Sequence, residues 1–242
     1  MLGALGWGSL AAGSLVIGAL LAFVRSWSDV QVGLVLAFGA GALISAVSFE
    51  LAEEGIAVGG LVWTAVGLAA GALTYFALDG VLARRSSSGR GRAGRTSGSN
   101  AGAALALGAF LDGVPEQLVL GIGLATGGGV GASLLVAIFV SNLPESIGSA
   151  RDMHAAGTSR ARILELWTAV AVVCAAATVG GYVAAEAATG EVRAFIDGFA
   201  AGALLVMLID SMIPEARRGA GRIAGLATTL GFAVAAALSS LS

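Results

Sequence analysis

The sequence predicts an all-α polytopic membrane protein, and three observations lead to this fold class. Of the 242 residues, 57% are hydrophobic and 12% are charged, about half the charged share of a soluble domain. The apolar residues form continuous runs, most of them long enough to cross about 30 Å of hydrocarbon as a helix. The arginines are concentrated in alternate gaps between these runs. Because the runs do not alternate between apolar and polar residues, a membrane β-barrel is not expected.

Eight apolar runs predict eight transmembrane helices within one domain that covers residues 1–242. Their expected bounds are residues 7–24, 30–49, 56–78, 101–124, 130–147, 163–187, 192–213 and 223–241. Of the 13 arginines, all but Arg193 follow the first, third, fifth or seventh run. Since positively charged loops stay in the cytoplasm, both termini are expected outside. The absence of Lys and the abundance of Ala, Gly and Arg suggest a bacterial gene, so the cytoplasmic membrane is the expected location.

The longest gap between runs, residues 84–100, is rich in Ser, Gly and Arg. This composition predicts a disordered basic loop on the cytoplasmic side. The loop's charge is explained by membrane topology, and nucleic-acid binding is not expected from so short a tethered segment.

A short internal repeat relates the second span to the seventh. The two copies are Phe38-Gly39-Ala40-Gly41-Ala42-Leu43 and Phe199-Ala200-Ala201-Gly202-Ala203-Leu204. They run in opposite directions in the predicted topology, as in secondary transporters built from inverted repeats. We therefore expect spans one to three to be related to spans six to eight, around central spans four and five.

Acidic residues follow both copies of the repeat. Glu50 and Asp210 lie deep enough either to line an ion pathway or to serve as ordinary helix ends, and both interpretations stay open. Glu53, Glu54 and Glu215 are interpreted as solvated helix ends.

Three pairs of glycines have the spacing that brings membrane helices into close contact. These pairs are Gly67 with Gly71, Gly198 with Gly202, and Gly221 with Gly225. We interpret each pair as a helix-packing site.

The central spans each carry a polar stretch with a proline. The stretches are Asp112-Gly113-Val114-Pro115-Glu116 and Ser141-Asn142-Leu143-Pro144-Glu145. A charge at bilayer depth costs about 2.5–3.5 kcal/mol on insertion scales, so such residues usually serve a function. Each proline removes one helix hydrogen bond and is expected to free the carbonyl of Leu111 or Val140.

Helical spacing brings these polar side chains together. Asp112 and Glu116 share one face of the fourth span, and Ser141, Asn142 and Glu145 lie within one turn of the fifth. Three carboxylates in one apolar volume cannot all stay ionised without a counter-charge. The five residues therefore predict a site for a cation, for protons, or for both.

The two stretches resemble the signature of the ZIP (Zrt-/Irt-like) metal-ion transporters, which have eight spans and external termini. That family carries His-Asn-x-Pro-Glu-Gly in span four and His/Gln-Glu/Asp-x-Pro-x-Glu, or a variant with Pro-Glu, in span five. The resemblance implies that Glu116 and Glu145 bridge the metal. Asp112 and Ser141 then occupy the positions where the family has His or Gln, and Asn142 occupies the position of a Glu or Asp ligand.

The resemblance also implies a homodimer and a ligand in span six. Val173 or Cys174 lies at the corresponding level. A thiol there is otherwise most simply a small apolar filler.

The expected function is membrane transport of divalent metal cations, with the metal ion as substrate. Because the donors are mainly oxygens, Mg²⁺, Mn²⁺ or Ca²⁺ suit the site better than Zn²⁺, although Zn²⁺ and Fe²⁺ stay compatible. The alternative is a degenerate family member that binds or senses a cation, or conducts protons, without metal flux. The expected partners are the lipid bilayer and metal ions.

An enzyme is not expected. The sequence contains neither His-Glu-x-x-His nor Gly-x-Ser-x-Gly, and its single histidine, His154, falls in a predicted loop.

Overall fold

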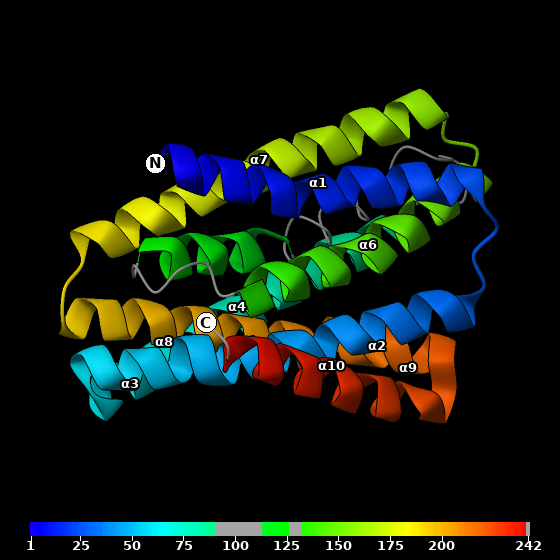
Figure 1. Cartoon of the computed structure of the whole chain (residues 1–242). Coiled ribbons are helices and arrows are strands. Elements are labelled where there is room, and N and C mark those ends of the chain that lie inside the picture. The colour runs from blue at the N-terminus through cyan, green and yellow to red at the C-terminus, as the bar shows by residue number, and fades with distance from the viewer. Residues whose placement is uncertain (91–112, 126–131, 241–242) are drawn as a thin grey trace.

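The computed structural model describes residues 1–90, 113–125 and 132–240, and the regular structure in these ranges is helical throughout (Figure 1). Helix α1 spans Leu2–Val24. Helix α2, Asp29–Ala46, begins at a capping box formed by Ser28 and Gln31. It continues through a π-helical segment, η1 (Val47–Ala52), into α3 (Glu53–Gly59).

The connection to the next helix lies at Gly60, whose φ of 90° is a conformation that favours glycine. This is later than the sequence predicts, because the helix runs on past the acidic residues near position 50. Helix α4 then spans Leu61–Arg90. It occupies residues 84–90 of the predicted loop, so the loop prediction is wrong there, and residues 91–100 lie outside the described ranges.

The second half begins with a helix over Gly113–Ala125 that carries the first motif. The elements that follow are α6 (Ala132–Ala155), α7 (Arg160–Ala187), α8 (Glu191–Met207), the π-helical η2 (Leu208–Met212), α9 (Ile213–Ala220), η3 (Gly221–Ile223) and α10 (Ala224–Ser239).

Five of the described segments are long and apolar enough to cross a membrane. These are Leu2–Val24, Asp29–Gly59, Leu61–Val81, Arg160–Ala187 and Glu191–Ser239. The last of them reverses direction at Gly221, where φ is 61°. Large apolar side chains are turned outward, for example Leu2 at 88% and Leu226 at 73% exposure. The chain is therefore an all-α protein suited to a membrane, while the eight crossings stay a prediction.

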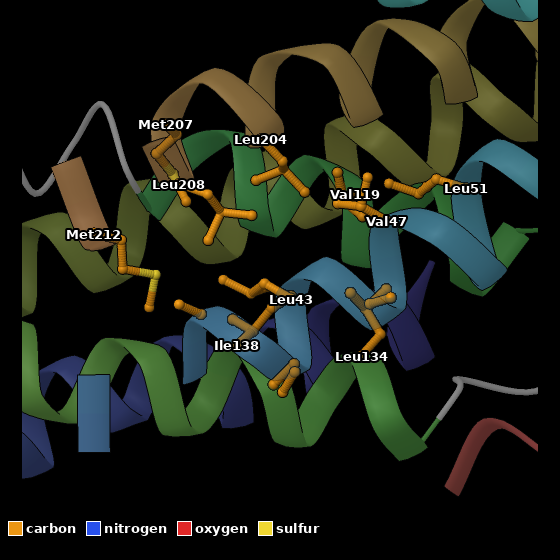
Figure 2. Packing of buried hydrophobic residues seen from close by; sticks show 14 of the residues in the cluster. Leu43, Val47, Leu51, Val119, Leu134, Ile138, Leu204, Met207, Leu208 and Met212 are labelled. Carbon is orange, nitrogen blue, oxygen red and sulfur yellow. The ribbon is translucent and has the colours of Figure 1, made fainter. Parts of the chain in front are cut away.

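Helix α6 lies in the middle of the bundle. It packs against α1 on one side and α2 on the other, and α1 also packs against α7 (Figure 1). The apolar core joins α2 and η1 to α6, α8 and the helix Gly113–Ala125. Figure 2 shows its side chains: Leu43, Val47, Leu51, Val119, Leu134, Ile138, Leu204, Met207, Leu208 and Met212.

The two helices that carry the repeat copies each approach a partner helix backbone to backbone. Helix α2 meets α10 where Gly41 faces the carbonyl of Thr228 and Gly231 faces the carbonyl of Phe38. Helix α8 meets α4 in the same manner. There Gly202 faces the carbonyl of Leu68 and Gly71 faces the carbonyl of Phe199. A Cβ atom at any of these four glycines would overlap the facing backbone, so close contact depends on glycine.

These contacts decide the outcome for the predicted glycine pairs. Gly67 and Gly71, like Gly198 and Gly202, lie against a neighbouring backbone, which confirms the packing interpretation. The packing interpretation is wrong for Gly221 and Gly225, because Gly221 forms a turn and Gly225 has open space around it.

The two π-helical segments occupy matching places. Segment η1 begins four residues after Leu43 and η2 four residues after Leu204, the last residues of the two repeat copies. π-Helical turns inside α-helices are frequent at functional sites.

Candidate functional site

Glu116 and Glu145 line the same small cavity at the centre of the bundle, which has a volume of about 20 Å³. Glu116 is 3% exposed and comes from the helix Gly113–Ala125, whereas Glu145 is half-buried on α6. A cavity of this volume holds about one water-sized species. The two carboxylates that the sequence pairs are therefore brought together. The complete lining is Leu36, Glu116, Glu145, Met207, Ser211, Met212 and Glu215.

Ser141 connects the two motif helices directly. Its Oγ lies 3.2 Å from Oε1 and 3.3 Å from Oε2 of Glu116, and 3.0 Å from the carbonyl oxygen of Ile138. The hydroxyl has one proton to donate, and a bond to a carboxylate is stronger than a bond to a neutral carbonyl. Ser141 is buried, so this bond holds Glu116 against α6 in the described structure.

Asn142 is completely buried beside Ser141 but is not among the residues that line the central cavity. Neither its Oδ1 nor its Nδ2 has a hydrogen-bond partner among the described residues. A buried polar group without a partner costs about 1–3 kcal/mol. Asn142 is therefore the predicted metal ligand whose side-chain amide has no hydrogen-bond partner among the described residues.

The two prolines have different local roles. Pro144 lies inside α6, so the carbonyl of Val140 receives no bond from residue 144. Pro115 lies in the first turn of the described helix Gly113–Ala125, where backbone N–H groups have no intrahelical acceptor within that helix. Leu111 and the predicted ligand Asp112 lie outside the described residues.

Sequence reasoning missed the third wall of the cavity, which comes from α8, η2 and α9. Met207, Ser211, Met212 and Glu215 supply two thioethers, a hydroxyl and a carboxylate. The repeat in the sequence indicated that this helix is important. It did not indicate which of the side chains on this helix face the cavity. Asp210 lies on the exposed side of η2, and Glu50 is half-buried in η1; neither lines the central cavity.

Glu215 also lines a second and larger cavity of about 250 Å³, which we call the arginine vestibule. Leu36 and Glu215 belong to both linings, so the two cavities adjoin. The interpretation of Glu215 as a simple solvated helix end is therefore incomplete. The vestibule is lined by Asp29, Val32, Gly33, Leu36, Gly148, Arg151, Asp152, Glu215, Arg218 and Gly219.

An ion-pair network closes one side of the vestibule. Arg151 places Nη1 2.8 Å from Oδ1 of Asp29 and Nε 3.3 Å from Oδ1 of Asp152. These neighbouring carboxylates raise the pKa of Arg151 above its ordinary value, above all through the hydrogen bond that Arg151 donates to Asp29. The network joins the end of α6 to the beginning of α2, at the face where the sequence places arginine-rich loops.

Cys174 on α7 lies beside the first motif. A Cβ built on Gly113 would come within 2.9 Å of its Sγ. Val173 is 42% exposed, whereas Cys174 is fully buried. Of the two residues at this level, Cys174 is the one that faces the central helices.

Within the described ranges, no group of three or more His, Cys, Asp or Glu side chains is arranged to hold a metal ion. Two of the three predicted carboxylates are in place, and the third, Asp112, lies outside these ranges.

The chain is thus an all-α protein with helices suited to a membrane and a small cavity that two carboxylates of the motifs line. Comparison with known proteins adds no family to this description. No family model matches the sequence, and no curated protein matches it.

Proposed function

We propose that the chain transports divalent metal cations across a membrane, with Glu116 and Glu145 holding the cation at mid-depth. The observation that carries the proposal is the cavity of about 20 Å³ that these two carboxylates share. Two ionised carboxylates in a space of low dielectric repel each other, and a bound cation removes that repulsion. Protons are the competing occupant.

The other donors bear on the choice of metal. Met207 and Met212 contribute thioethers, and Cys174 lies beside the motif. Sulfur ligands suit transition metals and are not used by Mg²⁺ or Ca²⁺. The proposed substrate is therefore a transition-metal ion such as Zn²⁺ or Fe²⁺, which revises the preference for hard cations drawn from the motif residues alone.

The arginine vestibule supports a route between the central cavity and one face of the protein. A cation leaving the cavity passes Leu36 and Glu215, which line both spaces. Glu215 then serves as the carboxylate that accompanies the ion between the two. In the proposed topology this face is cytoplasmic, and both termini are outside.

Eight crossings related by an inverted repeat are part of the same proposal. The matched contacts support this topology: Gly41 and Gly202 occupy the same place in the two repeat copies, and each faces a carbonyl on its partner helix. A second observation supports the inverted repeat: η1 and η2 each begin four residues after the end of a repeat copy. By the same resemblance to the ZIP family, we propose a homodimer in the bacterial cytoplasmic membrane.

A second candidate function is cation binding or proton conduction without metal flux. One observation favours it, namely that the described residues form no group of three His, Cys, Asp or Glu ligands. The motif positions that hold His in the ZIP family carry Asp112 and Ser141 here.

Metal flux into proteoliposomes distinguishes the candidates. We expect the wild type to take up a transition metal and Glu116→Ala/Glu145→Ala to take up none above empty vesicles. Glu186→Gln is a matched control, because Glu186 is an exposed carboxylate on α7 that accepts from the Tyr182 hydroxyl at 3.3 Å. Equal uptake by wild type and double variant would refute the transport site. Metal binding by the wild type without any flux would favour the second candidate.

A further inference from the structure

A second acidic cluster lies at the end of the bundle opposite the arginine vestibule, where α3, α4 and α8 meet. Its centre is Asp197 on α8, which is 1% exposed. Neither carboxylate oxygen of Asp197 has a hydrogen-bond partner among the described residues. An ionised carboxylate in this position has lost its water without gaining a donor, which is strongly unfavourable.

The three helices are packed tightly around this carboxylate. A Cβ built on Gly55 of α3 would lie 3.2 Å from Cβ of Asp197 and 3.1 Å from Oγ1 of Thr64 on α4. The Thr64 hydroxyl donates to the carbonyl of Gly60 at 3.1 Å. The proton of the Thr64 hydroxyl is therefore engaged and is not donated to Asp197.

The charges around Asp197 leave one negative charge uncompensated. Arg193, one turn earlier on α8, places Nη2 3.5 Å from Oε1 of Glu54, while its Nε is buried without a partner among the described residues. The Arg193–Glu54 pair joins α8 to α3, the helix whose Gly55 lies against Asp197. Glu53 directly precedes Glu54 on α3, and Glu50 lies one turn earlier, in η1. One guanidinium thus faces two carboxylates and is already paired with one of them.

A metal ion does not suit this cluster. A divalent cation requires several oxygen ligands, and Glu54 is already paired with Arg193. The Arg193 guanidinium would also repel it. A proton removes the excess charge without needing any further ligand.

We infer that Asp197 is a proton-binding site, protonated at neutral pH and enclosed by Gly55, Thr64 and the Arg193–Glu54 pair. Protons reach it from the face opposite the arginine vestibule. Glu54, whose side chain is 43% exposed, lines an open cavity of about 520 Å³ there. This inference goes beyond the proposed metal transport and does not depend on it.

Infrared difference spectroscopy of the purified full chain in lipid nanodiscs tests the inference without any metal. At pH 7 we expect a carboxylic-acid C=O band in the wild type that Asp197→Asn loses and the matched control Glu186→Gln keeps. Asn has the shape of a protonated Asp, so the variant should fold. A wild-type-minus-variant spectrum with only carboxylate bands at pH 7 would overturn the inference.

A second variant keeps the test valid if Asp197→Asn does not fold. Arg193→Gln removes the positive charge that favours ionisation of Asp197. We expect the acid band of Arg193→Gln to persist to higher pH than in the wild type. An acid band with the same pH dependence in both proteins would also overturn the assignment to Asp197.

Discussion

The chain buries carboxylates in two places, and the groups beside them differ. In the central cavity, Glu116 and Glu145 converge with the Ser141 hydroxyl and with thioethers. In the second acidic cluster, Arg193 and Glu54 form an ion pair, and Asp197 has no hydrogen-bond partner among the described residues. We propose that the two converging carboxylates with neutral donors hold a cation, whereas the single carboxylate beside a guanidinium that is already paired holds a proton.

The comparison teaches that an acidic residue in a membrane helix does not by itself indicate its ligand. A guanidinium already supplies the positive charge that a metal ion would bring, so it competes with the metal. Neutral oxygen and sulfur donors do not compete with it. The four predictions that follow test this distinction, beginning with the largest expected effect.

The strongest contrast should come from exchanging one carboxylate for an amide in each place. We expect Glu116→Gln to lower transition-metal affinity by more than about 100-fold, the upper end of what loss of an outer partner of a metal ligand costs. Asp197→Asn should leave that affinity unchanged. Calorimetric titration of the purified proteins measures both, and equal losses in the two variants would abolish the distinction between the clusters.

Loss of the hydroxyl that positions Glu116 should have a smaller effect. Ser141→Ala removes the donor at 3.2 Å, so we expect metal affinity to fall by about 10–100-fold while binding persists. Ser146→Ala is the matched control, since the Ser146 hydroxyl bonds to backbone carbonyls of α6 and not to a carboxylate. If Ser141→Ala bound metal like the wild type, Ser141 would not position the carboxylate.

The helices that carry the two repeat copies should be equally sensitive at their backbone contacts. Gly41→Ala and Gly202→Ala each force a methyl group against a facing carbonyl, and we expect each to lower the free energy of unfolding by about 1–3 kcal/mol. Thermal unfolding in detergent compares them with Gly225→Ala, which has open space around it. A large effect at only one of the two glycines would contradict the matched packing.

The smallest effect is expected at the arginine vestibule. Asp29→Asn weakens the exposed pair with Arg151, and such pairs contribute about 0–1 kcal/mol. We therefore expect the unfolding midpoint in detergent to stay close to that of the wild type. A large loss of stability would mean that this network holds α2 to α6, rather than only bordering the route to the cavity.

The sequence predicts the helices well because long apolar runs have few alternatives in a membrane. It places the turn after the second span too early, because Glu50, Glu53 and Glu54 resemble a helix end. In the structure these residues lie in η1 and α3, and the chain does not turn until Gly60.

The site is predicted only where spacing along one helix is sufficient. Glu116, Ser141 and Glu145 come together because each motif keeps its polar residues within one turn. Met207 and Ser211 were not predicted. The packing of α8 and η2 against the core decides which side chains of these two segments point into the cavity (Figure 2). Asp197 was not predicted either, since its burial comes from α3 and α4, which are distant in sequence.

The central claim is that Glu116 and Glu145 hold one cation jointly, and a double-mutant cycle on metal affinity tests it most directly. Affinities are measured by calorimetry for the wild type, Glu116→Gln, Glu145→Gln and the double variant. Ligands of one ion act as a unit, so we expect each single variant to lose nearly as much affinity as the double variant. Additive losses, or affinity that none of the variants changes, would contradict a shared site.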